Sequence, residues 1–184
     1  NVDFNLIRNN ISKIASQYES GYVRILILRN DSDEDFTIYS FYQQPINIPE
    51  NYSLESQPAP WHPGGDFEVN RDNIIGSKST SYAYNMKQTR EAIRNGFSDA
   101  LLLSNKGVVL EGPTFSVGWI KGEIIYVPDL DLGILDSITR KYLLKFGKEN
   151  KIATEVSRIT IDELYTVDTV FVMSTAKHGV FVSK

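Results

Sequence analysis

A stretch rich in proline and glycine, residues 44–76, divides this sequence into two differently patterned parts. It contains five of the seven prolines in the 184-residue chain. Proline fixes φ and removes a backbone donor, so neither a long helix nor a central strand can run through such a stretch. A connection of this length inside a compact chain is usually a functional loop or a linker. The sequence therefore predicts two lobes joined by an irregular crossing with room for one short strand.

The part before the crossing predicts one helix and a β-hairpin. Apolar residues recur at helical spacing over residues 3–18, and the helix is expected to end at Gly21. Residues 22–28 are apolar and β-branched and predict a buried strand. A polar turn at 30–35 leads to a second predicted strand at 36–42, and the two strands would pair as a hairpin.

The part after the crossing mixes helices with short β segments, which predicts an α+β or mixed α/β fold. Helices are expected at residues 84–96, with Gly96 just past the end, and at 137–149. The remaining apolar runs are bounded by turn residues and are short enough to be strands. The predicted strands are residues 100–103, 108–110, 114–120, 123–127, 153–159 and 169–173, the last of them the final strand, with a short helical turn at 161–165.

Composition excludes several classes of function. The net charge is −4 and no block of Lys or Arg occurs, so the chain has no footprint for nucleic acid or an anionic membrane. The absence of cysteine excludes disulfides, thiolate metal sites and a cysteine nucleophile. No apolar run approaches the roughly 20 residues that span a bilayer, and residues 1–8 do not read as a signal peptide. We expect a cytoplasmic enzyme that binds a small molecule and no metal.

Familiar catalytic motifs are missing, which leaves few candidates for chemistry. The sequence has no Gly-rich nucleotide loop, no zinc-protease helix motif and no nucleophile elbow. His62 and His178 are the only histidines, and we expect both to be ordinary loop or surface residues. Lys78 lies among small polar residues that leave room for a pocket. A buried lysine becomes nucleophilic toward a carbonyl, although a solvated lysine is the commoner alternative.

Glu111 is the second candidate, because it ends an apolar segment and precedes Gly-Pro. A buried carboxylate needs a partner, and a surface acid at a strand end is the alternative. Two further segments have the features of an anion site. Residues 133–140 open a helix whose N–H groups attract phosphate, although simple capping by Asp136 or Ser137 explains them equally well. Residues 174–176 end a strand with hydroxyl and small residues, where a plain turn is the alternative.

Taken in order, these segments resemble the class IV aminotransferase family, which includes branched-chain aminotransferases, D-amino-acid transaminases and aminodeoxychorismate lyase. The resemblance is close over residues 74–178 and looser over residues 1–45. Six segments in the family's order are not explained by chance. They are Lys78–Tyr82, Glu91–Ala92, Ser98–Leu103, Glu111–Pro113, Leu135–Arg140 and Ser174–Ala176.

The resemblance implies a fold-type IV enzyme that uses pyridoxal 5'-phosphate. Residues 1–45 would be the remainder of a small N-terminal α/β domain and residues 46–73 an interdomain loop. Residues 74–184 would be the large β-rich domain that binds the cofactor. The family's opening strands, an arginine there that also binds the phosphate, and the last strand and helix have no counterpart in this sequence. We therefore expect a fragment of a longer protein or a shortened paralogue, with weakened cofactor binding.

The resemblance also implies a role for individual residues. Lys78 would hold the cofactor covalently and move the proton between substrate Cα and cofactor C4'. Glu111 would pair with the protonated pyridine nitrogen, which makes the ring an electron sink, and Tyr82 would donate to the phenolic oxygen. The phosphate would be bound by Ile138, Thr139 and Thr175. The substrate carboxylate would face Thr175 and Ala176, and the pocket would be bordered by Tyr22 and Arg24.

Four positions depart from the family's pattern. Ser137 and Ser174 each replace a glycine, which could narrow the phosphate or carboxylate site. Ser81 and Ser116 stand where asparagine is common. The Arg-x-His pair of the D-amino-acid enzymes does not occur between residues 29 and 42, which favours an L-amino acid as substrate.

Three functions remain open from the sequence. The first is amino transfer between an L-amino acid of the branched-chain class and 2-oxoglutarate. The second is cleavage of aminodeoxychorismate to 4-aminobenzoate and pyruvate, which needs the same lysine and glutamate because both reactions remove the Cα proton. The third is a non-catalytic domain that keeps the fold. A homodimer is expected in each case, because family members are usually dimeric.

Overall fold

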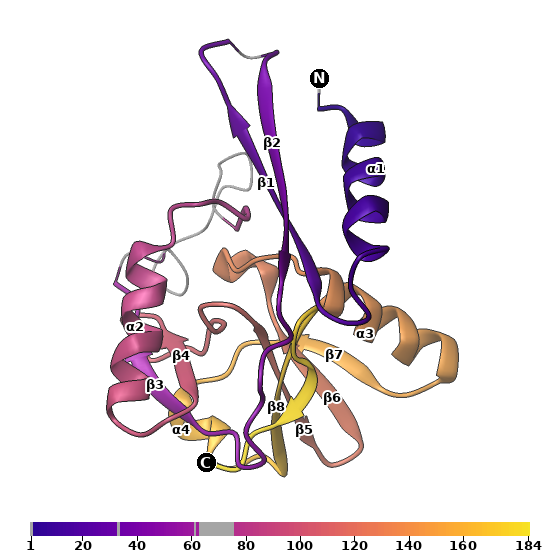
Figure 1. Ribbon diagram of the computed structural model, residues 1–184. Coiled ribbons are helices and arrows are strands. Elements are labelled where there is room, and N and C mark those ends of the chain that lie inside the picture. The colour runs from indigo at the N-terminus through magenta and orange to yellow at the C-terminus, as the bar shows by residue number, and fades with distance from the viewer. Residues whose placement is uncertain (1, 33, 61, 63–75) are drawn as a thin grey trace. The chain divides into compact units, whose positions relative to one another are not determined.

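The computed structural model describes residues 2–32, 34–60, 62 and 76–184. The chain consists of two compact units, Asn1–Asn47 and Ile48–Lys184, which are described separately below (Figure 1). Within the described residues, no helix combines the length and the apolar character that a membrane crossing requires.

The N-terminal unit contains one helix and the predicted hairpin. Helix α1 spans Phe4–Ala15, and its N-cap Asp3 accepts hydrogen bonds from the first-turn amides. It ends six residues before Gly21, so the predicted helix end was wrong. Strands β1 (Tyr22–Arg29) and β2 (Phe36–Gln43) pair antiparallel. No residue of β1 is fully buried, which corrects the expected buried strand. Among the described residues, β1 pairs with β2 alone.

The larger unit begins with a parallel strand pair and a helix. Strand β3 (Leu54–Pro58) lies beside β4 (Asp99–Leu103), and helix α2 (Ala83–Arg94) contacts both strands (Figure 1). The amide of Gln88 on α2 donates to the carbonyl of Pro58, at 3.2 Å. Part of the range 46–73, which we expected as a loop, therefore belongs to this unit.

A mixed five-stranded sheet forms the rest of the larger unit, in the order β7-β6-β5-β8-β9. Neighbouring strands are antiparallel except β6 and β7, which are parallel and joined through helix α3. A parallel pair needs such a crossover. The strands are β5 (Ser116–Lys121), β6 (Ile124–Pro128), β7 (Thr154–Ser157), β8 (Thr169–Ser174) and β9 (His178–Phe181), and the helices are η1 (Leu130–Leu132), α3 (Ile138–Asn150) and α4 (Ile161–Leu164).

Two predicted strand assignments need correction. Residues 108–110 form only isolated bridges, because Val109 and Leu110 are bonded to different neighbours, Ile159 and Leu102. The strand at 169–173 is also not the last one. Strand β9 pairs with it after a short turn, in the register Ser174↔His178.

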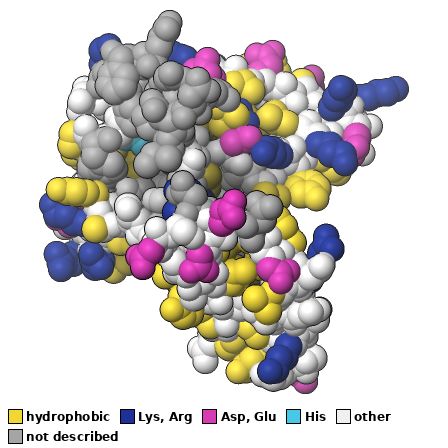
Figure 2. Space-filling model, turned by 90° about the horizontal axis from the view of Figure 1, so that it is seen from above, with side chains coloured by type: hydrophobic (Ala, Val, Ile, Leu, Met, Phe, Trp, Pro, Cys, Tyr) yellow, Lys and Arg dark blue, Asp and Glu magenta, His cyan; other side chains and the backbone are white. Residues whose placement is uncertain are grey.

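On the face seen in Figure 2, basic and acidic side chains both occur among hydrophobic ones.

The larger unit has a packed apolar core, and its loss should be measurable. Leu102 is fully buried on β4, in a cluster with Ala59, Leu110, Leu132 and Ile134. We expect Leu102→Ala to lower the free energy of unfolding by about 2–5 kcal/mol, because it removes buried methyl groups and leaves a cavity.

The measurement is urea unfolding of both proteins. Ile93→Ala is the matched control, since Ile93 is 55% exposed on α2, and it should cost less than about 1 kcal/mol. Equal losses for the two variants would contradict this description of the core.

Candidate functional site

Glu111 lies at the centre of the candidate site. Its backbone carbonyl accepts a hydrogen bond from the amide of Leu102 on β4. Its carboxylate Oε2 accepts one from the backbone amide of Leu135, at 3.2 Å. The side chain is only 16% exposed, so the acid at the end of the apolar segment is largely buried.

Burial dominates the electrostatics of Glu111. It raises the pKa of the carboxyl from 4.5 to about 7, against the opposing effects of the Leu135 amide and the Lys78 ammonium. His62 Nε2 lies 4.0 Å from Glu111 Oε1, beyond hydrogen-bonding distance. Burial lowers the pKa of His62 to about 4, so this imidazole is neutral near pH 7 and supplies no counter-charge.

Because its pKa is raised, Glu111 should make the folded protein less stable as pH rises. Between 4.5 and about 7 the folded protein retains a proton that the unfolded chain has released. The free energy of unfolding therefore decreases as pH rises through this window. The full effect above pH 7 corresponds to about 3 kcal/mol. We expect cofactor-free Glu111→Gln to equal the native protein near pH 4 and to exceed its stability by up to this amount at pH 8.

Urea unfolding between pH 4 and pH 8 would measure this difference. His62 titrates in both proteins, so the difference between them isolates Glu111. Glu149→Gln is the control, because the Glu149 side chain is 60% exposed, and its profile should follow that of the native protein. A constant offset for Glu111→Gln at every pH would contradict the assignment.

Lys78 and Tyr82 lie near Glu111. The Lys78 ammonium is 5.7 Å from the centroid of the Tyr82 ring, and it lowers the pKa of Glu111. Burial, and then the charge of Glu111, raise the pKa of Tyr82. Lys78 itself is exposed, although its small neighbours suggested a pocket. The structure thus brings together the three residues that were predicted to bind one end of a cofactor.

Gly76 explains how this segment approaches Glu111. It has a φ of 76°, and a Cβ atom on it would lie 2.8 Å from the carbonyl oxygen of Ile134. A left-handed φ and such a close approach both favour glycine. The segment that carries Lys78 therefore packs directly on the backbone that precedes Leu135, the donor to Glu111.

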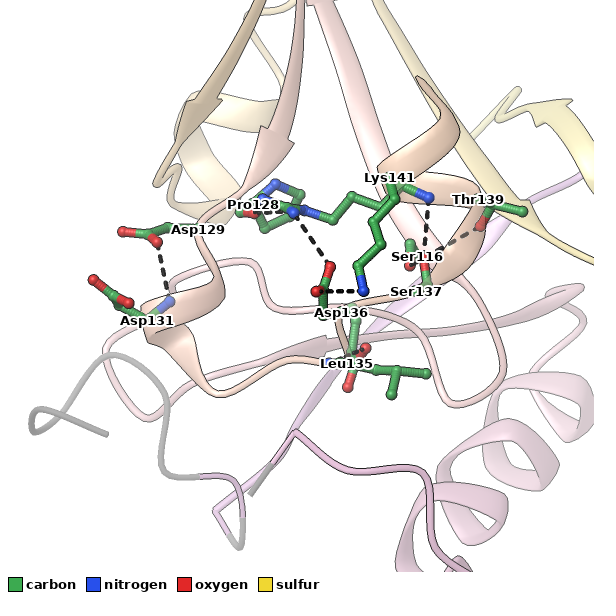
Figure 3. A network of polar contacts seen from close by, with 11 residues as sticks. Ser116, Pro128, Asp129, Asp131, Leu135, Asp136, Ser137, Thr139 and Lys141 are labelled. Carbon is green, nitrogen blue, oxygen red and sulfur yellow. Dashed lines mark hydrogen bonds and ion pairs between the residues drawn. The ribbon is translucent and has the colours of Figure 1, made fainter. Parts of the chain in front are cut away.

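Three hydroxyl groups meet at the start of helix α3 (Figure 3). Ser137 Oγ caps the helix by accepting from the Arg140 amide at 3.2 Å. It also lies 2.7 Å from Ser116 Oγ and 3.2 Å from Thr139 Oγ1. The first amides of a helix have no partner within it. The Ser137 cap satisfies that of Arg140, so Ile138 and Thr139 present the amides that a phosphate could use.

Charged residues of the same segment serve the fold (Figure 3). Arg140 is buried, and its Nε and Nη2 donate to the carbonyl of Pro128 at 3.3 and 3.1 Å. Asp136 lies 3.7 Å from Arg140 Nη1 and 2.9 Å from Lys141 Nζ. Arg140 therefore ties α3 to the end of β6.

The remaining predicted residues lie in two places. Thr175 is exposed and Ala176 half-buried in the turn between β8 and β9, where Ser174 Oγ accepts from the Lys177 amide at 3.0 Å. In the N-terminal unit, Tyr22 and Arg24 are two positions apart on β1 and so share a face of the hairpin.

Sequence reasoning missed three contributors to this site. Leu135 acts through its backbone amide, for which no residue type gives a signal. His62 was taken for an ordinary loop residue, yet its side chain is only 10% exposed beside Glu111. Ser116 was noted only as a departure from asparagine, whereas its hydroxyl joins the cluster at the α3 start.

The residues fit a cofactor that combines an aldehyde, a pyridine ring and a phosphate. The strongest observation is the buried Glu111 carboxylate, which the neutral His62 does not compensate. Such a group suits a cationic ring nitrogen. An amine at Lys78 suits the aldehyde, and the start of α3 suits the phosphate.

Comparison with known proteins gives the same family as these residues. The model of the class IV amino-transferase family matches residues 1–184. An aminodeoxychorismate lyase from Bacillus subtilis (strain 168) is 31% identical over 150 residues, which cover 79% of this chain and 51% of that protein. A branched-chain-amino-acid aminotransferase from Pseudomonas aeruginosa is 34% identical over 108 residues, or 59% of this chain and 35% of that protein. The chain thus spans about half, or less, of the length of these curated relatives.

Solved structures share the fold. A hypothetical aminotransferase from Mycobacterium tuberculosis, in its PLP-bound form, superposes with a TM-score of 0.83 at 21% identity, covering 98% of this chain and 68% of that one. The branched-chain amino acid aminotransferase of Escherichia coli gives 0.76 at 19% identity, covering 98% and 62%. The fold is therefore that of the fold-type IV transaminases, whose family uses pyridoxal phosphate. This chain belongs to the class IV aminotransferase family.

Proposed function

We propose that the chain is the cofactor-binding part of an aminotransferase that uses pyridoxal 5'-phosphate. The amino group would pass between an L-amino acid, of the branched-chain class, and 2-oxoglutarate. The observation that carries this proposal is the buried Glu111, held by the Leu135 amide within electrostatic reach of Lys78. A carboxylate, an amine and a phenol at one point are the groups that this cofactor requires from its protein.

The bound cofactor would supply an aldehyde and an electron-accepting ring. Lys78 would hold it covalently and then act as the base and acid that moves the proton at substrate Cα. Glu111 would keep the ring nitrogen protonated. The positive charge on that nitrogen would in turn lower the raised pKa of Glu111. Tyr82 would hydrogen-bond the phenolic oxygen of the ring.

The other proposed roles concern anion binding. The amides of Ile138 and Thr139 and the hydroxyl of Thr175 would bind the phosphate. Thr175 and Ala176 would face the substrate carboxylate through their amides. In the N-terminal unit, Tyr22 and Arg24 would border the substrate pocket. We further propose that the protein is a cytoplasmic homodimer. Analytical ultracentrifugation would measure its oligomeric state.

Aminodeoxychorismate cleavage is the second candidate function. It is favoured by the relative from Bacillus subtilis, which is 31% identical and covers 79% of this chain. The same Lys78 and Glu111 would serve both reactions, because each begins with removal of the Cα proton. The products separate them: release of pyruvate from aminodeoxychorismate supports the lyase, and exchange between leucine and 2-oxoglutarate supports the aminotransferase.

The first test is a spectrum of the purified protein with pyridoxal phosphate, followed by borohydride reduction and peptide mapping. We expect a visible absorption band and an adduct on Lys78. Label scattered over surface lysines would reject the proposed site and leave a non-catalytic domain. Where the adduct is found, both reactions are assayed, and failure of both would also support a non-catalytic domain.

A further inference from the structure

A largely buried lysine that has no part in the proposed chemistry lies next to the site. Lys177 directly follows Thr175 and Ala176 in the turn between β8 and β9. Its side chain is only 10% exposed. The ammonium lies 3.5 Å from Asp99 Oδ2 and donates to Thr114 Oγ1 at 3.0 Å. A lysine this buried needs a reason, because burying an ammonium is costly unless it is paired.

Asp99, at the start of β4, is a rigid anchor for this ammonium. Its Oδ1 accepts from Thr89 Oγ1 at 2.8 Å and from the Ala100 amide at 2.9 Å. Its Oδ2 accepts from Tyr52 OH at 3.4 Å as well as from Lys177. An ionised carboxylate has about four acceptor positions, so this one is saturated. Its orientation is fixed by two other segments, through Thr89 and Tyr52, and by the neighbouring Ala100 amide before Lys177 contributes.

The same ammonium also reaches the loop that follows Glu111. It lies 5.1 Å from the centroid of the Phe115 ring, within the range of a cation–π interaction. The Phe115 ring covers Gly112 so closely that a Cβ atom on Gly112 would lie 2.1 Å from it. Lys177 therefore joins the turn that carries Thr175 and Ala176 to the loop that begins at Glu111.

We propose that Lys177 is a positioning residue, whose contacts with Asp99, Thr114 and Phe115 hold the Ser174–Lys177 turn in the geometry that binds the substrate carboxylate. The proposal rests on the proposed function of Thr175 and Ala176. A buried ion pair by itself is weak evidence for stability. Its place, between the loop proposed to bind the cofactor and the turn proposed to bind the substrate, is what gives this pair a role in binding.

The test uses four variants: Lys177→Met, Lys177→Arg, Asp99→Asn and the double Lys177→Met/Asp99→Asn. Lys145→Met is the control, because Lys145 is 65% exposed on α3. The first readout is amide hydrogen exchange in the cofactor-free protein. In Lys177→Met the amides of Thr175 and Ala176 should exchange at least about tenfold faster, while those of β5 and β6 keep their native rates.

The second readout is kinetic, in the cofactor-loaded protein. Lys177→Met should raise KM for the amino acid by about tenfold or more with a smaller change in kcat, since misplacement of a binding group by about 1 Å is costly. Lys177→Arg, which keeps the charge, should recover part of the loss. The effects of Lys177→Met and Asp99→Asn should not add in the double variant, because the two residues act as one pair.

Each outcome decides the proposal. A lower unfolding temperature with native exchange in the turn and a native KM would make the pair purely structural and overturn it. If Lys177→Met does not fold, amide exchange in the turn and KM are compared in Lys177→Arg and Asp99→Asn instead. If the turn loosens as expected but no cofactor adduct forms on Lys78 in the unaltered protein, Lys177 holds the turn, but the proposed function fails and the role in substrate binding fails with it.

Discussion

Replacing Lys78 with alanine should lower the rate of amino transfer by about 10²–10⁴-fold, because it removes the base that moves the Cα proton. The variant should also lose the visible absorption band and the borohydride adduct. The physical basis is the position of the ammonium, 5.7 Å from the Tyr82 ring and close enough to Glu111 to lower its pKa. Stopped-flow spectra and turnover with leucine measure both effects.

Two further variants make this result specific to Lys78. Lys78→Arg keeps the positive charge without a nucleophile, so it should be as inactive as alanine. Lys145→Arg changes an exposed lysine on α3 and should remain fully active. Methylamine added to Lys78→Ala should restore part of the rate, because a free amine can replace the missing base. A fully active alanine variant would remove Lys78 from the site.

Replacing Glu111 with glutamine should produce a different defect of about 10²-fold or more in turnover. A neutral amide cannot hold a proton on the ring nitrogen, so the ring would stabilise negative charge poorly. The covalent link at Lys78 does not depend on Glu111, and the adduct should therefore still form. This separation of binding from turnover is the signature of a residue that tunes the cofactor.

The measurement compares adduct yield with turnover in the same preparation. Glu149→Gln, at an exposed carboxylate on α3, should change neither. If Glu111→Gln lost the adduct together with the activity, the carboxylate would be holding Lys78 in place instead. If it kept full turnover, Glu111 would have no role at the ring nitrogen.

Local sequence patterns predicted most of the elements because each depends on nearby residues. Apolar spacing predicted α1, a glycine just past the helix end marked α2, a second helix predicted over residues 137–149 corresponds to α3, and turn residues separated the short strands. Helix α1 was predicted too long because a glycine was taken as its end, while its apolar pattern already stops near Ala15. Strand β9 was missed because four residues, His178–Phe181, offer too little pattern on their own. These residues form a strand because they pair with β8.

The candidate site was predictable only as far as side chains mark it. Lys78 and Glu111 stood out by residue type and order, and in the structure the Lys78 charge lowers the pKa of Glu111. The donor to Glu111 is a backbone amide, that of Leu135, which no residue letter reveals. The partners of Lys177 lie up to 78 positions away in the chain, so a pairing of this kind appears only when the fold brings the segments together.

Gly76 limits which substitutions this sequence can accept near the candidate site. The residue has no functional group, yet any side chain there would push against the Ile134 carbonyl, next to the amide that holds Glu111. A library of all substitutions at this position should therefore yield glycine alone among active clones. The space left by the backbone therefore restricts substitutions around the site, as the need for particular functional groups also does. Gly76, which has no functional group, is among the positions that are hardest to replace.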